Sequence, residues 1–467
     1  MSRKVDVVII GAGSAGLSAL AQVRRTDKSF VIINDGYEGT TCARVGCMPS
    51  KALIETANLY HSRRRMAGLG LSGADQIGVD GSAVLARVRD IRDKLVKGVI
   101  GSYRDGLTDD QFIRGRARLL GPDRVTVNGE EIQAGSIIIA TGSSPVVPAP
   151  FRDLGDALIT TDTLFEQTAL PRSLAVVGLG AIGCEVGQAL GRLGVSVHGF
   201  DLAEQIAGIR DPEVARVAAQ MIGRDMRITT GVQVSPEPDE GRVRVNAGGK
   251  TYTVDKLLAS LGRRPNTQDL GLDSLGVALD ERGMPEFDRQ TLQIGSLPVY
   301  FCGDVNGDRP LLHEANDEGR IAALNAVAPA GRAFRRRVPL AIAFTEPQIV
   351  TVGAGFDQLD PATLAVGTYQ PIRQGRAMIK GSNEGLLRIY ADRFSGRLLG
   401  ATLLMADAEH MGHWLSVAID QGLTLRDCLG QTFYHPVMEE AMQAALQRCL
   451  AQCEDAGDLP PGMRAAG

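Results

Sequence analysis

Two cysteines five positions apart are the first residues in this chain whose types and spacing could perform chemistry. Cys42 and Cys47 lie in the segment Thr-Cys-Ala-Arg-Val-Gly-Cys-Met-Pro-Ser-Lys, which ends at Lys51. Such a pair can close a small ring at the start of a helix, where the helix dipole favours a thiolate. As a disulfide it accepts two electrons, and as a dithiol it delivers them. Two unreactive free cysteines or a structural disulfide would show the same spacing, so the surroundings must decide.

Glycine-rich turns define those surroundings, because one precedes the cysteine pair and another lies near the middle of the chain. In a G-x-G-x-x-G turn the first glycine permits a tight bend, the second admits a pyrophosphate, and the third lets helix and strand pack closely. The following helix offers free N–H groups to the phosphates. Each turn here stands between a β-branched run and a helix, and the glycines are Gly11, Gly13, Gly16, Gly178, Gly180 and Gly183. Together the two turns predict two dinucleotide sites.

One acidic residue bears on the choice of coenzyme at the second turn. An apolar run, 195–200, follows the second glycine-rich helix, and Asp201 comes directly after it. A carboxylate at this position accepts hydrogen bonds from the 2′-hydroxyl of an adenosine ribose and repels a 2′-phosphate. No arginine follows until Arg210. The sequence therefore predicts NAD rather than NADP.

A histidine near the C-terminus could act as an acid–base group. His435 is followed five residues later by Glu440. Imidazole moves protons near neutral pH, and a carboxylate fixes its tautomer and raises its basicity. For an isolated histidine, a His-Pro turn that caps a helix would be the simpler interpretation. His410 and His413 are three residues apart with no further ligand cluster, so we expect surface or interface residues and no metal there.

Composition restricts the class of protein without identifying it. The 467 residues allow two to four domains, and the net charge of −4 gives no reason to expect a nucleic acid or an anionic membrane as partner. With no long apolar run, a cytoplasmic protein is expected. Seven scattered cysteines argue against a disulfide scaffold. The arginine runs 63–65 and 335–337 are interpreted as solvated faces or linkers.

The order of motifs along nearly the whole chain resembles that of the class I pyridine nucleotide-disulfide oxidoreductases, which include dihydrolipoamide dehydrogenase, glutathione reductase and mercuric reductase. The version Gly-Cys-Met-Pro-Ser-Lys of the cysteine motif is more similar to the lipoamide and mercuric branch than to the glutathione branch. The segments that carry the resemblance are 11–16, 41–51, 140–142, 178–183, 262–266, 303–304 and 435–436.

This resemblance implies an α/β fold with two Rossmann-like dinucleotide-binding domains, for FAD and NAD, and a C-terminal α+β dimerisation domain. The implied segments are an FAD-binding domain with the redox disulfide (1–148), an NAD-binding domain (149–265), a central domain completing the FAD site (266–337) and an interface domain (338–467). The sequence pattern agrees, since apolar runs at 386–390 and 398–404 precede helical segments around 408–421 and 437–452. A homodimer is expected.

Roles for individual residues also follow from the resemblance. Cys47 would be the thiolate beside the flavin, Cys42 the thiol that exchanges with substrate, and His435, oriented by Glu440, the acid–base catalyst. Lys51 would lie near the flavin and pair with the carboxylate of Glu185. The FAD site would comprise Gly11, Gly13, Gly16, Asn34, Asp35, Lys51, Gly115, Thr141, Gly142, Ser143, Asp304, Leu311, Leu312 and His313. The NAD site would comprise Gly178, Gly180, Gly183, Asp201, Val232 and Gly262, with the rest of 179–184.

The implied activity is that of a dihydrolipoamide dehydrogenase, which oxidises dihydrolipoamide, or the lipoyl domain of a 2-oxoacid dehydrogenase complex, with NAD⁺. Asn34 stands where the family has an acid for the adenosine ribose of FAD, with Asp35 beside it. A mercuric-type or other disulfide reductase is an alternative, with Cys449 and Cys453 as a second thiol pair. A non-catalytic flavoprotein serving as a docking subunit is another, against which the retained cysteine pair speaks.

Overall fold

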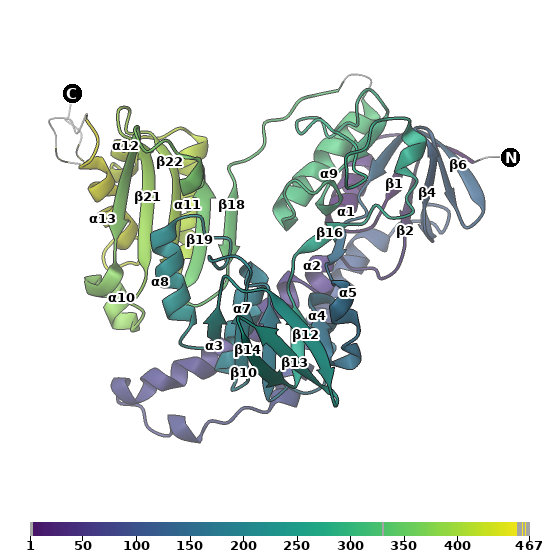
Figure 1. The fold of residues 1–467 in the computed structure, drawn as a ribbon. Helices are drawn as coiled ribbons and strands as arrows, with labels where there is room; N and C mark the ends of the chain where they lie inside the picture. The colour runs from purple at the N-terminus through teal and green to yellow at the C-terminus, as the bar shows by residue number, and fades with distance from the viewer. Residues whose placement is uncertain (1–2, 329–330, 455–459, 461–462, 464–467) are drawn as a thin grey trace.

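A computed structural model represents the chain and describes residues 3–328, 331–454, 460 and 463. Two mainly parallel sheets, a small antiparallel meander and an antiparallel C-terminal sheet make up its framework (Figure 1). Among the described helices, none has both the length and the hydropathy needed to cross a lipid bilayer. Each of the two larger N-terminal sheets carries one glycine-rich turn, so each positions one candidate nucleotide site.

The N-terminal sheet is built around β1, the apolar run before the first glycine-rich turn. β1 pairs in parallel with β2 on one side and β6 on the other, and Val7, Val8 and Ile9 are fully buried. Burial on both faces is typical of a parallel strand covered by helices. Helices α1 (Ser14–Val23) and α9 (Leu312–Val327) pack together beside this sheet (Figure 1). Its strands are β1 (Arg3–Ile10), β2 (Phe30–Asn34), β3 (Phe112–Arg114), β4 (Arg118–Gly121), β5 (Arg124–Val127), β6 (Glu130–Ile139) and β17 (Val299–Phe301).

The second sheet is fully parallel and has the order β11-β10-β9-β15-β8. The second glycine-rich turn follows β9, and helices α7 (Ala181–Arg192) and α8 (Pro212–Ile222) accompany the sheet. Its strands are β8 (Leu158–Thr160), β9 (Ser173–Val177), β10 (Ser196–Phe200), β11 (Arg227–Thr229) and β15 (Lys256–Ala259). The antiparallel meander comprises β12 (Val234–Asp239), β13 (Arg242–Ala247) and β14 (Lys250–Val254).

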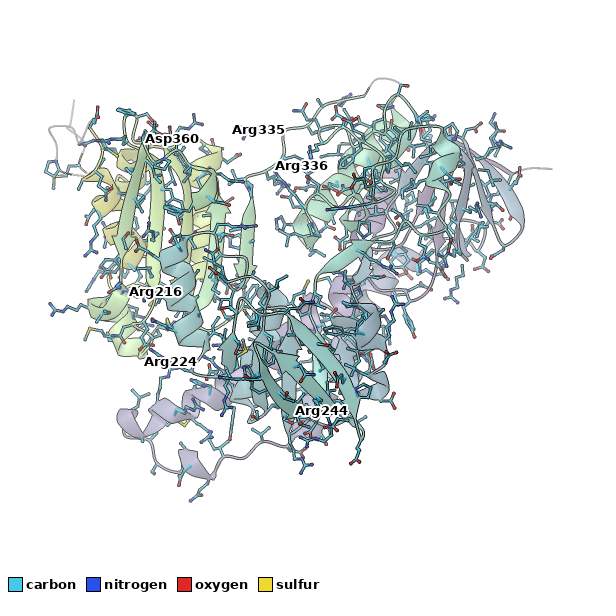
Figure 2. The ribbon with its side chains drawn as sticks, viewed as in Figure 1. Arg216, Arg224, Arg244, Arg335, Arg336 and Asp360 are labelled. Carbon is cyan, nitrogen blue, oxygen red and sulfur yellow. The ribbon has the colours of Figure 1, made fainter. Side chains whose placement is uncertain are left out.

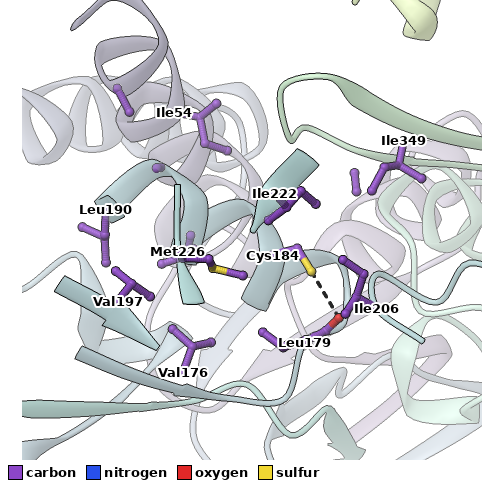
Figure 3. Packing of buried hydrophobic residues seen from close by; sticks show 14 of the residues in the cluster. Ile54, Val176, Leu179, Cys184, Leu190, Val197, Ile206, Ile222, Met226 and Ile349 are labelled. Carbon is purple, nitrogen blue, oxygen red and sulfur yellow. Dashed lines mark hydrogen bonds between the residues drawn. The ribbon is translucent and has the colours of Figure 1, made fainter. Parts of the chain in front are cut away.

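Between β2 and β3 the chain leaves the N-terminal sheet as three helices, α2 (Thr41–Arg44), α3 (Cys47–Met66) and α4 (Gly81–Arg104). Helix α3 is fixed to the second domain, because Ile54 from α3 lies in the same apolar cluster as Leu190 from α7 (Figure 3). The strands β7 (Ser143–Pro145) and β16 (Arg263–Pro265) pair across the same junction. The helix that starts at Cys47 is therefore held between the two nucleotide-binding units.

The C-terminal domain is an antiparallel sheet of order β18-β19-β22-β21-β20 with helices packed on it (Figure 1). Its strands are β18 (Leu340–Ala343), β19 (Gln348–Gly353), β20 (Leu364–Tyr369), β21 (Leu386–Asp392) and β22 (Leu398–Met405). The helices are α10 (Gly375–Lys380), α11 (Ala408–Asp420), α12 (Leu425–Leu429) and α13 (Glu440–Leu450). The predicted fold class, with two dinucleotide-binding folds followed by an α+β domain, is confirmed.

The segment that joins α9 to β18 corrects one expectation about the arginine runs. Arg335 and Arg337 are exposed, as expected of a linker, and pair with Asp420 and Asp317 respectively. Arg336, labelled beside Arg335 in Figure 2, has a side chain that is only 11% exposed. It pairs with Glu314 at 2.6 Å and with Glu318 at 2.7 Å. The interpretation of the whole run as solvated is wrong for Arg336, because two buried carboxylates of α9 need a counter-charge.

Candidate active site

The two cysteines of the predicted redox pair lie in α2 and at the start of α3, and their pKa values shift in opposite directions. Both are free thiols, with Cys42 in α2 and Cys47 as the first residue of α3. The Cys42 thiol donates a hydrogen bond to the Cys47 sulfur, which, together with burial, raises the pKa of Cys42. The same hydrogen bond, helped by the positive charge of Lys51 and opposed by burial, lowers the pKa of Cys47 to about 7. Cys47 is thus the thiol of the pair that ionises near neutral pH, and Cys42 is the one that keeps its proton there.

The loop before the pair holds this arrangement in place. Thr40 has a positive φ of 57°, and its hydroxyl accepts a hydrogen bond from the backbone N–H of Ala43. Gly39 has a φ of 104°, and a Cβ there would lie 2.6 Å from Val96 of α4. The chain therefore turns sharply into α2 at a position where only glycine fits.

Lys51 lies one helical turn after Cys47 and forms the ion pair predicted for it. Its ammonium is 2.8 Å from Glu185 of α7, whose side chain is 4% exposed. The second oxygen of Glu185 accepts the backbone N–H of Phe344 at 2.7 Å, and the Lys51 ammonium lies 4.5 Å from the centre of the Phe344 ring. A buried carboxylate with these two donors fixes the lysine beside the thiols.

The first glycine-rich turn has the shape of a pyrophosphate cradle. A Cβ at Gly11 would lie 2.3 Å from the Ala140 carbonyl oxygen, and one at Gly16 would lie 1.9 Å from the Gly11 carbonyl oxygen. A Cβ at Gly13 would meet nothing within 4 Å. The first and third glycines are thus required by the protein itself, whereas the second faces open space in which a phosphate fits.

The second turn repeats this pattern. A Cβ at Gly178 would lie 2.2 Å from the Ser260 carbonyl oxygen, and one at Gly183 would lie 2.0 Å from that of Gly178. Again the middle glycine, Gly180, has nothing within 4 Å. The residues present therefore fit two dinucleotides, one for each turn.

A cavity of about 1690 Å³ runs from the first turn and collects many of the residues predicted to bind FAD. The predicted residues that line it are Gly11, Asn34, Asp35, Gly115, Thr141, Ser143 and Asp304, together with Gly262 of the NAD set. Those that do not line it are Gly13, Gly16, Lys51, Gly142, Leu311, Leu312 and His313. Leu311 precedes the first residue of α9 as its N-cap, so the free N–H groups of that helix begin next to Pro310, which does line the cavity.

Asn34 lines the cavity and is also bonded to the protein. Its side-chain oxygen accepts the backbone N–H of Ala12 at 3.0 Å, and its amide nitrogen makes long bonds of 3.4 and 3.5 Å to the carbonyl oxygens of Gly36 and Tyr37. Asp35 follows it, lines the same cavity and is exposed. In this chain the carboxylate at the end of β2 is therefore the one at position 35.

Two side chains that were not predicted at this cavity, Arg263 and Asn266, bond the predicted residues Ser143 and Thr141 that line it. Arg263 donates to the Ser143 hydroxyl at 2.8 Å and to the Ser143 carbonyl at 2.6 Å, while that hydroxyl donates to Asp304 at 2.7 Å. Asn266 donates to the Thr141 carbonyl at 2.9 Å. Both belong to the motif 262–266, for which the family resemblance implies a role only at Gly262.

The buried cluster around Arg336 fixes the turn that contains Asp304. Glu318 is fully buried and accepts the backbone N–H of Gly303 at 2.6 Å and the side-chain amide of Asn306 at 2.7 Å. Burial raises the pKa of Glu318, and the charge of Arg336 opposes that rise. The cluster could not be found from residue spacing, because its members come from separate elements.

At the second turn, Asp201 lies where the sequence placed it. Its carboxylate accepts the backbone N–H of Leu179 at 2.6 Å and that of Ala203 at 2.8 Å. The backbone N–H of Val232 donates to the Asp201 carbonyl at 3.0 Å, so these two predicted residues are adjacent. Cys184 lies behind the turn and donates to the Leu179 carbonyl at 3.3 Å (Figure 3).

His435 and Glu440 form the predicted pair in the C-terminal domain. The His435 Nδ1 is 2.8 Å from Glu440, and the imidazole is 78% exposed. The hydrogen bond from His435 lowers the pKa of Glu440. Gln374, which is buried and was not predicted, donates to the Val437 carbonyl at 2.7 Å and reaches Glu440 at 3.4 Å. Within the described residues, the contacts of His435 include neither thiol of the redox pair.

The other residues considered for chemistry lie elsewhere. Cys449 and Cys453 are buried in the core of the C-terminal domain, and Cys453 lies beyond the end of α13. Burial raises the pKa of Cys449 to about 12. His410 is largely exposed, and His413 bonds the Glu409 carbonyl at 2.7 Å. The described part of the chain holds no group of three or more acidic, histidine or cysteine side chains suited to a metal ion.

Comparison with known proteins defines the class to which this fold and site belong. Residues 5–319 match the pyridine nucleotide-disulphide oxidoreductase family, and residues 339–446 match the dimerisation domain of that family. The chain therefore belongs to the pyridine nucleotide-disulphide oxidoreductase family, whose members are flavoproteins that use a pyridine nucleotide. The resemblance stated from the sequence is confirmed, and the dimerisation domain supports a homodimer.

Individual relatives differ in the substrates that their names state. Over 458 residues the chain is 31% identical to a dihydrolipoyl dehydrogenase from Thermus scotoductus, covering 95% of this chain and 97% of that protein. Over 452 residues it is 29% identical to a mercuric reductase from Staphylococcus aureus, covering 94% of this chain and 81% of that protein. A solved structure of the HOCl-induced flavoprotein disulfide reductase RclA from Escherichia coli, as its Cu(II) complex, has a TM-score of 0.84 at 24% identity, covering 95% and 99% of the two chains. This structural similarity supports the fold and no more than the fold.

Proposed function

We propose that this protein is a dihydrolipoamide dehydrogenase that uses NAD⁺. The observation that carries the proposal is the Cys42–Cys47 pair, whose members lie in α2 and at the start of α3 and whose pKa values shift in opposite directions. When the two sulfurs are joined as a disulfide, a substrate thiolate can attack Cys42, and Cys47, the more acidic of the two thiols, leaves as the thiolate. The Lys51–Glu185 ion pair beside it and the two glycine-rich cradles support the same assignment.

The reaction balances as a two-electron transfer. Two S–H bonds of dihydrolipoamide break and one S–S bond forms. Two electrons and one proton reach NAD⁺ as a hydride equivalent, and the second proton goes to solvent. FAD, when bound, supplies the two-electron step between the thiols and the nicotinamide. His435, held by Glu440, would remove the proton from a substrate thiol, and the resulting thiolate would attack Cys42 of the oxidised Cys42–Cys47 disulfide. That S–S bond breaks, Cys47 leaves as a thiolate, and Cys42 is joined to the substrate sulfur as a mixed disulfide until the second substrate thiol displaces it.

We also propose NAD⁺ as the coenzyme, contacts to FAD, and a lipoyl domain as the partner. Asp201 favours NAD⁺, because a carboxylate at the end of this strand accepts hydrogen bonds from ribose hydroxyls and repels a 2′-phosphate. Ser143, Asp304 and Asp35 would hold FAD from the floor and the adenosine end of the large cavity. A lipoyl domain of a 2-oxoacid dehydrogenase complex would be the macromolecular substrate, in line with the names of the relatives in which dihydrolipoyl dehydrogenase occurs.

A steady-state assay of the FAD-loaded protein tests the proposal. Dihydrolipoamide with NAD⁺ should turn over, and glutathione disulfide with NADH and Hg²⁺ with NADPH should be slower in kcat/KM by at least about tenfold. Cys42→Ser should abolish dihydrolipoamide turnover, whereas Cys428→Ser, at a buried thiol far along the chain, serves as the control. Faster turnover of Hg²⁺ would contradict the proposal and favour the mercuric-type alternative.

A further inference from the structure

A second cavity, of about 520 Å³, opens beside Cys42. Its walls come from α1 and the residues just after it, from α4, from α9 and from the segment around the redox pair. Leu17, Leu95 and Val99 give it an apolar side that suits an aliphatic chain. Since Cys42 is the thiol assigned to substrate exchange, this cavity is where a substrate chain would lie.

The charged side chains that line this cavity are all positive. Arg25 and Arg320 both line it, and in the described part of the chain no acidic side chain does. We propose that the cavity accepts aliphatic dithiols that end in a carboxylate as well as the neutral amide, with Arg25 and Arg320 binding that carboxylate. This inference rests on the proposed function and adds a carboxylate-ended class of dithiol to its substrates.

Both arginines retain positive charge for a ligand. Arg320 is 3.1 Å from Asp317, but Asp317 also pairs with Arg337 at 2.7 Å, so one carboxylate is shared between two guanidinium groups. Within the described residues, the Arg25 side chain has no carboxylate within ion-pair distance. A guanidinium offers a planar fork of donors that matches a carboxylate better than a neutral amide.

Dihydrolipoate and dihydrolipoamide form a matched pair of probes for this idea. The two share the dithiol and the aliphatic chain and differ only in the terminal group, a carboxylate in one and a neutral amide in the other. The ratio of their kcat/KM values with NAD⁺ therefore isolates the contribution of the terminal charge. In the FAD-loaded wild-type dimer at low ionic strength, we expect this ratio to be at least about one. Added salt should lower it, since salt screens partly exposed charges.

Substitutions then assign the effect to particular residues. Arg25→Gln and Arg320→Gln should each lower the ratio by about threefold, as expected for partly exposed ion pairs, and the double variant by about tenfold. Arg24→Gln is the control, because Arg24 precedes Arg25 but bonds the carbonyl oxygens of Tyr103 and Asp105 and does not line the cavity. Its ratio should equal that of the wild type.

Two results would overturn the inference. One is a double variant with normal circular dichroism and flavin content whose ratio is unchanged. The other, which needs no variant, is a wild-type ratio that salt does not lower. Turnover of neither dithiol would be a different result, because it would overturn the proposed function itself.

Discussion

The Cys42 thiol donates a hydrogen bond to the Cys47 sulfur, and this contact shifts the pKa values of the two thiols in opposite directions. Cys47 is therefore the better leaving thiolate when a substrate sulfur attacks Cys42 in the disulfide form of the pair, and the thiolate left on Cys47 can then interact with an electron acceptor. The positive charge of Lys51, fixed by Glu185, lies on the thiolate side. The asymmetry of the site therefore comes from side chains of α2, α3 and α7 acting together.

The acidity of Cys47 leads to a spectroscopic prediction. In the FAD-loaded Cys42→Ser variant, Cys47 is the remaining thiol, and its thiolate should give a long-wavelength absorbance band beside the oxidised flavin. The hydroxyl introduced by Cys42→Ser can donate a hydrogen bond in place of the thiol, and Lys51 remains, so the pKa of Cys47 should stay below its ordinary value. The band should therefore be present above that pKa and disappear as the pH falls through it. The measurement is an absorbance titration between pH 5 and 10.

Adding Lys51→Met to that variant should move the midpoint of the titration to higher pH, because the positive charge that lowers the pKa is gone. The control is Lys28→Met, a lysine that pairs with Asp6 at the surface. An unchanged midpoint after loss of Lys51 would contradict this account of the thiolate.

Coenzyme choice gives a second prediction. Asp201→Asn keeps the shape of the side chain but removes its charge, so the preference for NAD⁺ over NADP⁺ should fall by at least about tenfold in kcat/KM. Asp153→Asn, at an exposed position of the same domain, is the control. Equal use of the two coenzymes by the wild-type protein would show that the assignment of NAD⁺ is wrong.

The buried pairing of Arg336 gives a prediction about stability. Arg336→Met leaves Glu318 buried without its counter-charge and should lower the free energy of unfolding by about 3–5 kcal/mol. Arg337→Met, which removes an exposed arginine from the neighbouring position, should cost at most about 1 kcal/mol. Urea unfolding of the flavin-free protein measures both.

The pH dependence of this loss has a definite sign. Burial raises the pKa of Glu318 above its ordinary value, so the folded state binds a proton there more readily than the unfolded state does. Such a group favours folding at low pH, and that advantage is lost as the pH rises through its folded pKa. The difference between Arg336→Met and the wild type should therefore shrink as the pH falls. A constant difference would show that the destabilisation arises from lost packing.

The sequence predicted the local features of this site and missed those made by tertiary contacts. The glycine turns and the His435–Glu440 pair each lie within a few residues of chain, so spacing and residue type were sufficient to find them. The ion pair between Lys51 and Glu185 joins distant segments, and only family resemblance indicated it. The burial of Arg336 could not be predicted from the sequence. A run of three arginines has the same pattern whether its middle member is solvated or buried against carboxylates of another helix.

The last prediction concerns how the base reaches the thiol. His435 lies in the C-terminal domain and, within the described residues of one chain, its contacts do not include Cys42. Its imidazole is 78% exposed, although a base must come within hydrogen-bond reach of the thiol it serves. We therefore expect a homodimer in which His435 acts on Cys42 of the other subunit. Mixing inactive Cys42→Ser and His435→Ala proteins under subunit exchange should restore activity, because each heterodimer then has one intact site and one site lacking both groups. If both residues acted within one chain, every heterodimer site would be defective and no activity would return. Mixing either variant with itself is the control.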